Sequence, residues 1–156
     1  LTVAFMLELL SPIKGEFIMD IGSGSGWQTA ILASIVGEKG KVYAIERIKE
    51  LCDLGKNNIS KYNFIKKGIV KTFCQDASAG LPNIAKEIGG FDGIIAAAAL
   101  KMENSEPENA LPEPWKKQLK IGGRIVTPIE NSVWLFIKNK NGSTLKQVGP
   151  FFNLPC

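Results

Sequence analysis

Hydrophobic and polar positions along the chain follow two alternating periods, which predict strands and helices in turn. Short runs that are apolar on both faces have the character of buried parallel strands. Between them, apolar residues recur at helical spacing. An example is the segment 27–36, which is followed by Gly37 as the expected C-cap. We expect strands at 17–21, 42–46, 69–74, 91–99 and 124–129, and helices at 1–10, 27–36, 48–62 (with Leu51 and Leu54 inward) and 115–119.

The end of the chain has a different pattern. Residues 132–138 alternate as a strand, and Asn141-Gly142 is a turn signal that leads into a second strand at 144–148. The segment Lys101 to Pro114, rich in Glu, Asn and Pro, is expected to be an exposed irregular loop, with a lid over a cleft as the alternative. The sequence therefore predicts one domain over 1–156: a doubly wound, mostly parallel α/β sheet with a C-terminal antiparallel hairpin.

Composition excludes several kinds of chemistry. The chain of 156 residues contains no histidine, so Ser-His-Asp and Cys-His nucleophile pairs, histidine metal ligands and a histidine base are all excluded. The net charge is +4, which is too small to argue for nucleic acid without a clustered patch. The sequence contains no run of 18 uncharged apolar residues, so we expect no membrane span.

The three cysteines indicate a reducing environment. Cys52, Cys74 and Cys156 are odd in number and form no CxxC pair, so the sequence predicts neither a disulfide framework nor a zinc site. Cys52 and Cys74 are expected to be small buried apolar residues. A cytoplasmic location follows as an expectation.

The most informative segment is the glycine-rich turn Asp20–Trp27, where the first strand meets the following helix. Glycines permit positive φ, and a helix start offers unpaired N–H groups. Glu46 ends the second strand, 20 positions after Gly26, where a carboxylate can accept the hydroxyls of a ribose. Asp76 follows the third strand. The structural alternative is that Asp76 only caps a turn and that Glu46 pairs with Arg47 or Lys49.

Two features favour a methyl donor over a nicotinamide cofactor. The sixth place of the dinucleotide fingerprint is Trp27 instead of glycine. Asp20 places a negative charge near the turn, which repels a diphosphate and suits the ammonium and sulfonium of S-adenosylmethionine. We assign Asp20 to the methionine end, Glu46 to the ribose and Asp76 to the adenine. The candidate cofactor-binding residues are Asp20, Gly22, Ser23, Gly24, Ser25, Gly26, Trp27, Glu46, Arg47, Asp76 and Ala77.

These residues resemble the protein-L-isoaspartate O-methyltransferases. The resemblance is carried by the segments Thr2–Leu10, Asp20–Trp27, Gly40–Ile48, Phe91–Ala99 and Gln118–Val126, in order over most of the chain. It implies a Rossmann-like methyltransferase fold and transfer of a methyl group from S-adenosylmethionine to the α-carboxylate of isoaspartyl residues in damaged proteins. The product cofactor is S-adenosylhomocysteine, and the partners are isoaspartyl proteins or peptides, with neither a membrane nor nucleic acid expected.

The resemblance also implies a Thr-Ile-Ser-x-Pro segment just before the opening helix, whose serine touches cofactor and substrate. Because the chain starts at Leu1, we name no catalytic residue and expect this chain alone to transfer methyl groups poorly. Two alternatives remain. The first is another methyltransferase, for a small molecule or for RNA bound by Lys61, Lys66, Lys67 and Lys71, with Tyr62 and Phe64 expected in the core. The second is a cofactor-binding module without catalysis.

Overall fold

A computed structural model describes residues 2–102, 104 and 106–150 of the chain. It contains two compact units, which we describe separately. The first unit is Pro12–Ala77, and the second consists of the described parts of Leu1–Ser11 and Ser78–Cys156. The single-domain assignment over 1–156 stays a prediction. No helix among the described residues has the length and hydrophobicity to cross a membrane.

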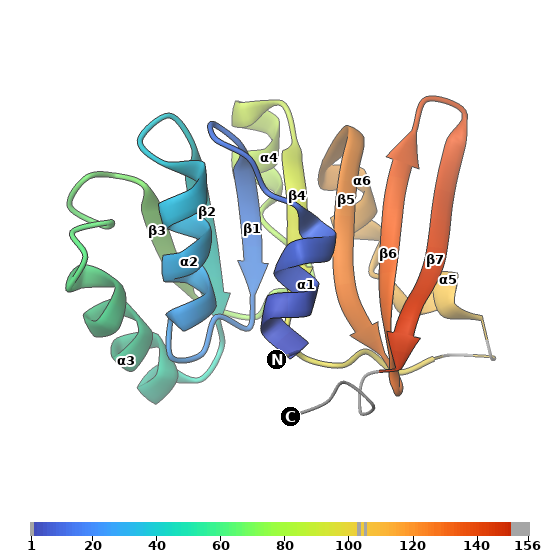
Figure 1. Ribbon diagram of the computed structural model, residues 1–156, viewed down its shortest axis with the longest axis horizontal. Coiled ribbons are helices and arrows are strands. Elements are labelled where there is room, and N and C mark those ends of the chain that lie inside the picture. The colour runs from blue at the N-terminus through green and yellow to red at the C-terminus, as the bar shows by residue number, and fades with distance from the viewer. Residues whose placement is uncertain (1, 103, 105, 151–156) are drawn as a thin grey trace. The chain divides into compact units, whose positions relative to one another are not determined.

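The first unit is a parallel sheet with two helices on one face (Figure 1). Its strand order is β3-β2-β1, in register from Phe17 opposite Lys41 and from Val42 opposite Val70. The strands carry buried apolar side chains on both faces, as expected for a parallel sheet. Its elements are β1 (Phe17–Ile21), α2 (Trp27–Val36), β2 (Lys41–Glu46), α3 (Lys49–Ser60) and β3 (Val70–Cys74).

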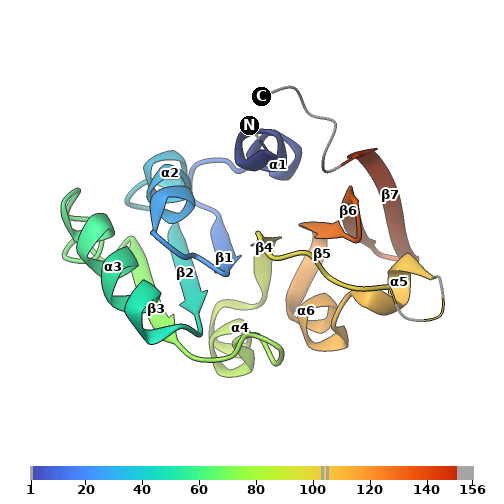
Figure 2. The same ribbon diagram turned by 90° about the horizontal axis from the view of Figure 1, so that it is seen from below.

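The second unit is a mixed sheet with helices on both faces. Strand β4 pairs with β5 in parallel, and β5, β6 and β7 pair antiparallel. Figure 2 shows α1 on one side of these strands and α4 and α6 on the other. Its elements are α1 (Thr2–Leu10), α4 (Pro82–Ile88), β4 (Phe91–Ala96), α5 (Pro107–Ala110), α6 (Glu113–Gln118), β5 (Leu119–Ile129), β6 (Ser132–Asn139) and β7 (Gly142–Pro150).

Arg124 on β5 joins α1 to this sheet. Its guanidinium donates to the carbonyl oxygens of Leu10 at 2.6 Å, Ser11 at 3.0 Å and Asp92 at 3.0 Å. The last carbonyls of a helix have no partner within it, so a cation with a donor fork is well suited to this end. Arg124 therefore fixes the C-terminal end of α1 against β4 and β5.

The α/β class and the C-terminal antiparallel hairpin are confirmed, and the main differences lie at glycines. Helix α4 was not expected, although Pro82 at its start and Gly89 at its C-cap are the ordinary signals for one. Strand β5 begins at Leu119, five residues earlier than expected. Gly122-Gly123 lies within the strand, where the register with β4 shifts, and does not interrupt it. In the hairpin, Gly142 pairs with Asn139, so the turn lies one residue earlier than expected.

The described residues of the segment from Lys101 to Pro114 are mostly exposed and in part helical. It contains the short helix α5, and the Met102 N–H donates to the Glu130 carboxylate at 2.7 Å. Residues 103 and 105 lie outside the described residues. In the described residues of this segment, the expected exposure is confirmed. The expected irregular backbone is not, because the segment contains α5.

Candidate functional site

The glycine turn is held against the end of β2 by its own backbone. The N–H groups of Gly22 and Ser23 both donate to the Ile45 carbonyl, at 2.8 and 3.1 Å. Gly22 and Gly24 have φ values of 73° and 51°, in the left-handed region that side-chain-bearing residues seldom adopt. A Cβ atom on Gly22 would meet nothing within 4 Å, and one on Gly24 would meet only the Gly22 oxygen at 3.9 Å. The turn therefore presents bare backbone to open space.

Helix α3 approaches this turn at two glycines. A Cβ atom on Gly55 would lie 2.6 Å from the Gly24 oxygen, and one on Gly26 would lie 2.8 Å from the Gly55 oxygen. Real Cβ atoms essentially never come so close to a backbone oxygen, so a side chain at either position would force the turn and α3 to shift. Because Gly55 and Ile59 form the buried face of α3, Leu54 is 46% exposed and not inward as expected. Gly55 was missed from sequence, although a glycine inside a helical pattern often marks close packing.

Glu46 is fixed by three backbone donors. Its Oε2 atom accepts from the Gly24 N–H at 3.0 Å, and its Oε1 atom accepts from the N–H groups of Arg47 and Ile48 at 2.9 and 3.0 Å. The residue is only 8% exposed, and a carboxylate offers about four lone-pair positions. At least one on Oε2 therefore remains for a ligand hydroxyl. The alternative that Glu46 pairs with Lys49 is not seen, since Lys49 pairs with Asp53 at 2.6 Å.

Asp20 lies beneath the turn and not on its surface. Its side chain is fully buried, and its two oxygens accept from Gln28 Nε2 at 2.7 Å and Thr29 Oγ1 at 2.6 Å. Burial raises the pKa of Asp20 from 3.8 to about 6, against the lowering effect of the bonds from Thr29 and Gln28; nearby Glu46 raises it further. The structure differs from the expected direct contact with a ligand ammonium, because both oxygens are directed at α2. Asp20 therefore holds the first turn of that helix through Gln28 and Thr29.

The remaining acidic candidate lies at the neighbouring strand end. Cys74, the last residue of β3, is in register with Glu46, and the Gln75 N–H donates to the Glu46 carbonyl at 2.9 Å. Asp76 follows directly and is exposed, as is Arg47, while Ala77 is half-buried. The carboxyl ends of β2 and β3 thus bring Glu46 and Asp76 to one edge of the first unit's sheet.

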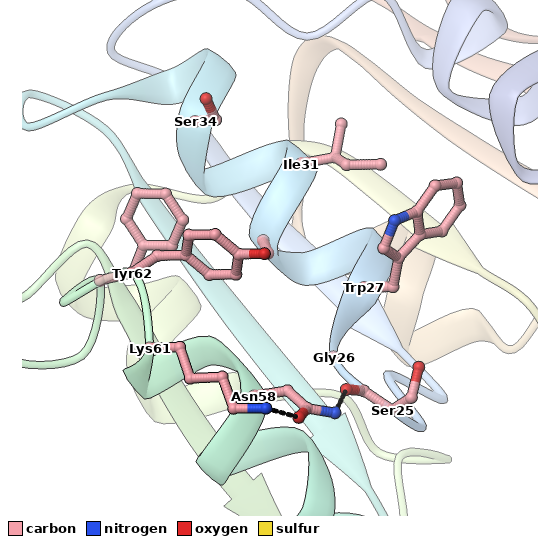
Figure 3. Close-up of a pocket in the computed structure, with 10 residues that line it drawn as sticks. Ser25, Gly26, Trp27, Ile31, Ser34, Asn58, Lys61 and Tyr62 are labelled. Atoms are coloured by element: carbon pink, nitrogen blue, oxygen red, sulfur yellow. Dashed lines mark hydrogen bonds between the residues drawn. The ribbon is translucent and has the colours of Figure 1, made fainter.

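A hollow of about 720 Å³ extends from the glycine turn along α2 (Figure 3). Ser25, Gly26 and Trp27 contribute to its lining, and the Asn58 side chain on α3 donates to the Ser25 carbonyl at 2.9 Å. Trp27 is 60% exposed and Tyr62 63% exposed, so Tyr62 is not a core residue as expected.

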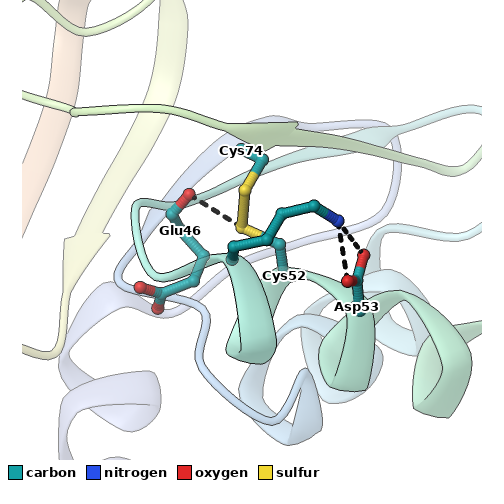
Figure 4. A network of polar contacts seen from close by, with 5 residues as sticks. Glu46, Cys52, Asp53 and Cys74 are labelled. Atoms are coloured by element: carbon teal, nitrogen blue, oxygen red, sulfur yellow. Dashed lines mark hydrogen bonds and ion pairs between the residues drawn. A yellow bond between two sulfur atoms is a disulfide. The ribbon is translucent and has the colours of Figure 1, made fainter.

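The cysteine expectation is wrong for two residues. Cys52 on α3 and Cys74 at the end of β3 form a disulfide, with their Cα atoms 5.8 Å apart (Figure 4). Cys52 is half-buried and Cys74 is exposed, so they are not buried apolar residues. The two cysteines are 22 residues apart in sequence, so their spacing does not predict the bond. They meet because β3 pairs with β2, which places Cys74 opposite Glu46, shortly before α3. Cys156 lies outside the described residues.

The chain matches the family model for protein-L-isoaspartate(D-aspartate) O-methyltransferase over residues 1–149. A protein-L-isoaspartate O-methyltransferase from Aeropyrum pernix is 41% identical over 128 residues, which cover 81% of this chain and 44% of the relative. The chain spans about half the length of the curated relatives that it matches.

Solved structures extend the likeness to the fold. One protein-L-isoaspartate O-methyltransferase matches with a TM-score of 0.79 at 26% identity, over 95% of this chain and 44% of that one. Another, from Plasmodium falciparum and in complex with S-adenosyl-L-homocysteine, matches with a TM-score of 0.70 at 26% identity, over 96% and 68%. The Rossmann-like methyltransferase fold is thereby confirmed. The match to the family model and the shared fold lead to one conclusion: this chain belongs to the protein-L-isoaspartate O-methyltransferase family.

Proposed function

We propose that the protein transfers a methyl group from S-adenosylmethionine to the α-carboxylate of L-isoaspartyl residues in damaged proteins. Family membership supports the reaction class, and the P. falciparum relative supports the cofactor, since that protein binds S-adenosyl-L-homocysteine. The observation that carries the proposal is the Glu46 carboxylate. It is held by three backbone N–H groups beside a glycine turn that is open to a ligand.

The residues of the first unit fit an adenosyl cofactor. Glu46 offers an acceptor for a ribose hydroxyl, and Asp76 with Ala77 stands at the next strand end for the adenine. The turn from Gly22 to Trp27 allows close approach of the methionine end, and the exposed side chain of Arg47 borders the site. When bound, S-adenosylmethionine supplies a methyl group made electrophilic by the sulfonium.

The absence of histidine is consistent with this reaction. The proposed nucleophile is a carboxylate, which is already ionised at neutral pH, so no base has to remove a proton. What the protein contributes is alignment of the attacking oxygen, the methyl carbon and the leaving sulfur. A methyl ester formed in this way can close to a succinimide and reopen as aspartate, which would make the reaction one of protein repair.

The proposal includes isoaspartyl proteins as partners and does not include nucleic acid. Three of the four lysines that suggested RNA have local partners. Lys61 donates to the Asn58 side chain at 3.1 Å, Lys67 lies 3.7 Å from Glu38, and Lys71 lies over the Phe73 ring. A cytoplasmic location stays a prediction. The cysteine pattern no longer supports it, because Cys52 and Cys74 form a disulfide.

Methyl labelling tests the proposed reaction. The chain is incubated with radiolabelled S-adenosylmethionine and an isoaspartyl peptide, its aspartyl twin or bulk RNA. We expect label on the isoaspartyl peptide alone, at the low level that this chain reaches by itself, and released by mild base as methanol because the product is an ester. Label on RNA, or on both peptides equally, would contradict the proposal. Calorimetric binding of S-adenosylhomocysteine without labelling of any acceptor would favour a cofactor-binding module.

A further inference from the structure

The Cys52–Cys74 disulfide joins the two chain segments that carry the proposed cofactor contacts. Cys74 immediately precedes Gln75 and Asp76, the adenine side of the site. Cys52 lies in the first turn of α3, six residues after Glu46, and its Sγ atom is 3.1 Å from the Glu46 carbonyl oxygen. The bond therefore ties the end of β3 to the helix that follows the ribose-binding strand (Figure 4).

A reduced Cys52 has a hydrogen-bond partner ready. Its thiol can donate to the Glu46 carbonyl at the observed 3.1 Å, and its N–H donates to the Ile48 carbonyl at 2.9 Å. Cys74 is exposed, and so are the two residues that follow it. Opening the bond thus leaves Cys52 in place and removes one covalent tether from the segment Cys74–Asp76.

The bond is also within reach of a reductant. Both cysteines line a hollow of about 240 Å³ with Lys49, Asp53 and Lys56, and Cys74 is exposed to solvent. A thiolate of an external dithiol can attack one sulfur of the pair, breaking the S–S bond and forming a mixed disulfide. The second thiol of the dithiol then releases the protein. The products are two cysteine thiols and the oxidised dithiol, a transfer of two electrons and two protons.

We propose that Cys52 and Cys74 form a thiol–disulfide switch that sets the affinity of the site for its adenosyl cofactor. This inference depends on the proposed cofactor. The oxidised form holds the Asp76 segment in position before the ligand arrives, and the reduced form must order it on binding. The oxidised protein therefore binds the cofactor more tightly.

Calorimetric titration with S-adenosylhomocysteine, before and after treatment with dithiothreitol, tests the switch, and the mass difference of two hydrogens verifies the redox state. We expect reduction to raise the Kd about 5- to 10-fold, within the usual range of coupling between two sites. Cys52→Ser and Cys74→Ser should have the weaker affinity with or without dithiothreitol. Cys156→Ser is the matched control and should keep the full response.

Hydrogen exchange provides a second measurement that does not depend on folding of the variants. On reduction of the natural chain, exchange of the Gln75 amide should speed up, while the Gly22 amide, bonded to Ile45, should stay unchanged. Equal Kd values in the two redox states, or tighter binding by the reduced form, would overturn the switch and leave the proposed function standing. Failure of both forms to bind would overturn the proposed cofactor and the switch together.

Discussion

Glu46 and Asp20 are both buried carboxylates, yet they face different environments. Glu46 is held by backbone donors at the edge of the turn, whereas Asp20 is enclosed by side chains of α2. A ligand can therefore use the first as an acceptor, and the second serves to position the helix. The two residues have distinguishable consequences when they are changed.

Glu46→Gln should weaken binding of S-adenosylhomocysteine by roughly 1.5–3 kcal/mol, or about 10- to 150-fold in Kd, because hydrogen bonds to a charged acceptor have this value. The amide keeps the shape of the side chain, but its NH₂ group replaces an oxygen that accepts from a backbone N–H, so two donors would face each other. Isothermal calorimetry measures the effect. Glu50→Gln, an exposed change in the first turn of α3, is the control and should bind normally. An unchanged Kd for Glu46→Gln would remove the ribose assignment.

Asp20 should make stability depend on pH between about 4 and 6. Its pKa is raised from 3.8 to about 6 in the folded chain, so the folded state keeps a proton that the unfolded state loses over this range. Its contribution to the free energy of unfolding is largest below pH 3.8 and falls by about 3 kcal/mol as pH rises through 6, at 1.36 kcal/mol per pKa unit.

Urea unfolding of the natural chain and Asp20→Asn at several pH values measures this contribution. The variant should lack the decline between pH 4 and 6 that the natural chain shows. Equal pH dependence in the two proteins would mean that Asp20 is not buried as described.

At the scale of elements, the packing of α3 on the glycine turn depends on Gly55. An alanine in a helix is ordinarily more stable than glycine by about 0.5–1 kcal/mol. At this position, however, the new methyl group would lie 2.6 Å from the Gly24 oxygen. Gly55→Ala should therefore lower the free energy of unfolding by about 1–3 kcal/mol, the usual cost of overpacking, and also weaken cofactor binding.

Urea unfolding and calorimetry check both effects of Gly55→Ala. Asn57→Ala on the same helix is exposed and should leave both values close to those of the natural chain. A stabilised Gly55→Ala protein would show that α3 does not approach the turn so closely.

Sequence predicted the elements where periodicity is strong and failed where glycine has a tertiary role. Strand β1 and helix α2 were expected with the bounds that they have, because apolar spacing and Gly37 define them locally. The inward face of α3 was misjudged, since Gly55 can be recognised as a contact only when the turn opposite is known. The buried position of Asp20 was missed for the same reason: Gln28 and Thr29 become its partners only when α2 packs on β1.

At the scale of the whole molecule, a ligand that binds only the folded chain should stabilise it by mass action. S-adenosylhomocysteine at about 100 times its Kd should add about 2.7 kcal/mol, which corresponds to about 5–10 °C in Tm for a chain of this size. Differential scanning fluorimetry measures the shift. Glu46→Gln at the same ligand concentration should show a smaller shift. No shift in the natural chain would argue against cofactor binding.

The three backbone bonds to Glu46 have a consequence for how a ligand is received. A free glutamate side chain loses rotamer entropy when a partner immobilises it. Here that loss occurs during folding, when Gly24, Arg47 and Ile48 capture the carboxylate. A ribose bound as we propose would therefore meet a preorganised acceptor, and its binding would require no rearrangement at this residue.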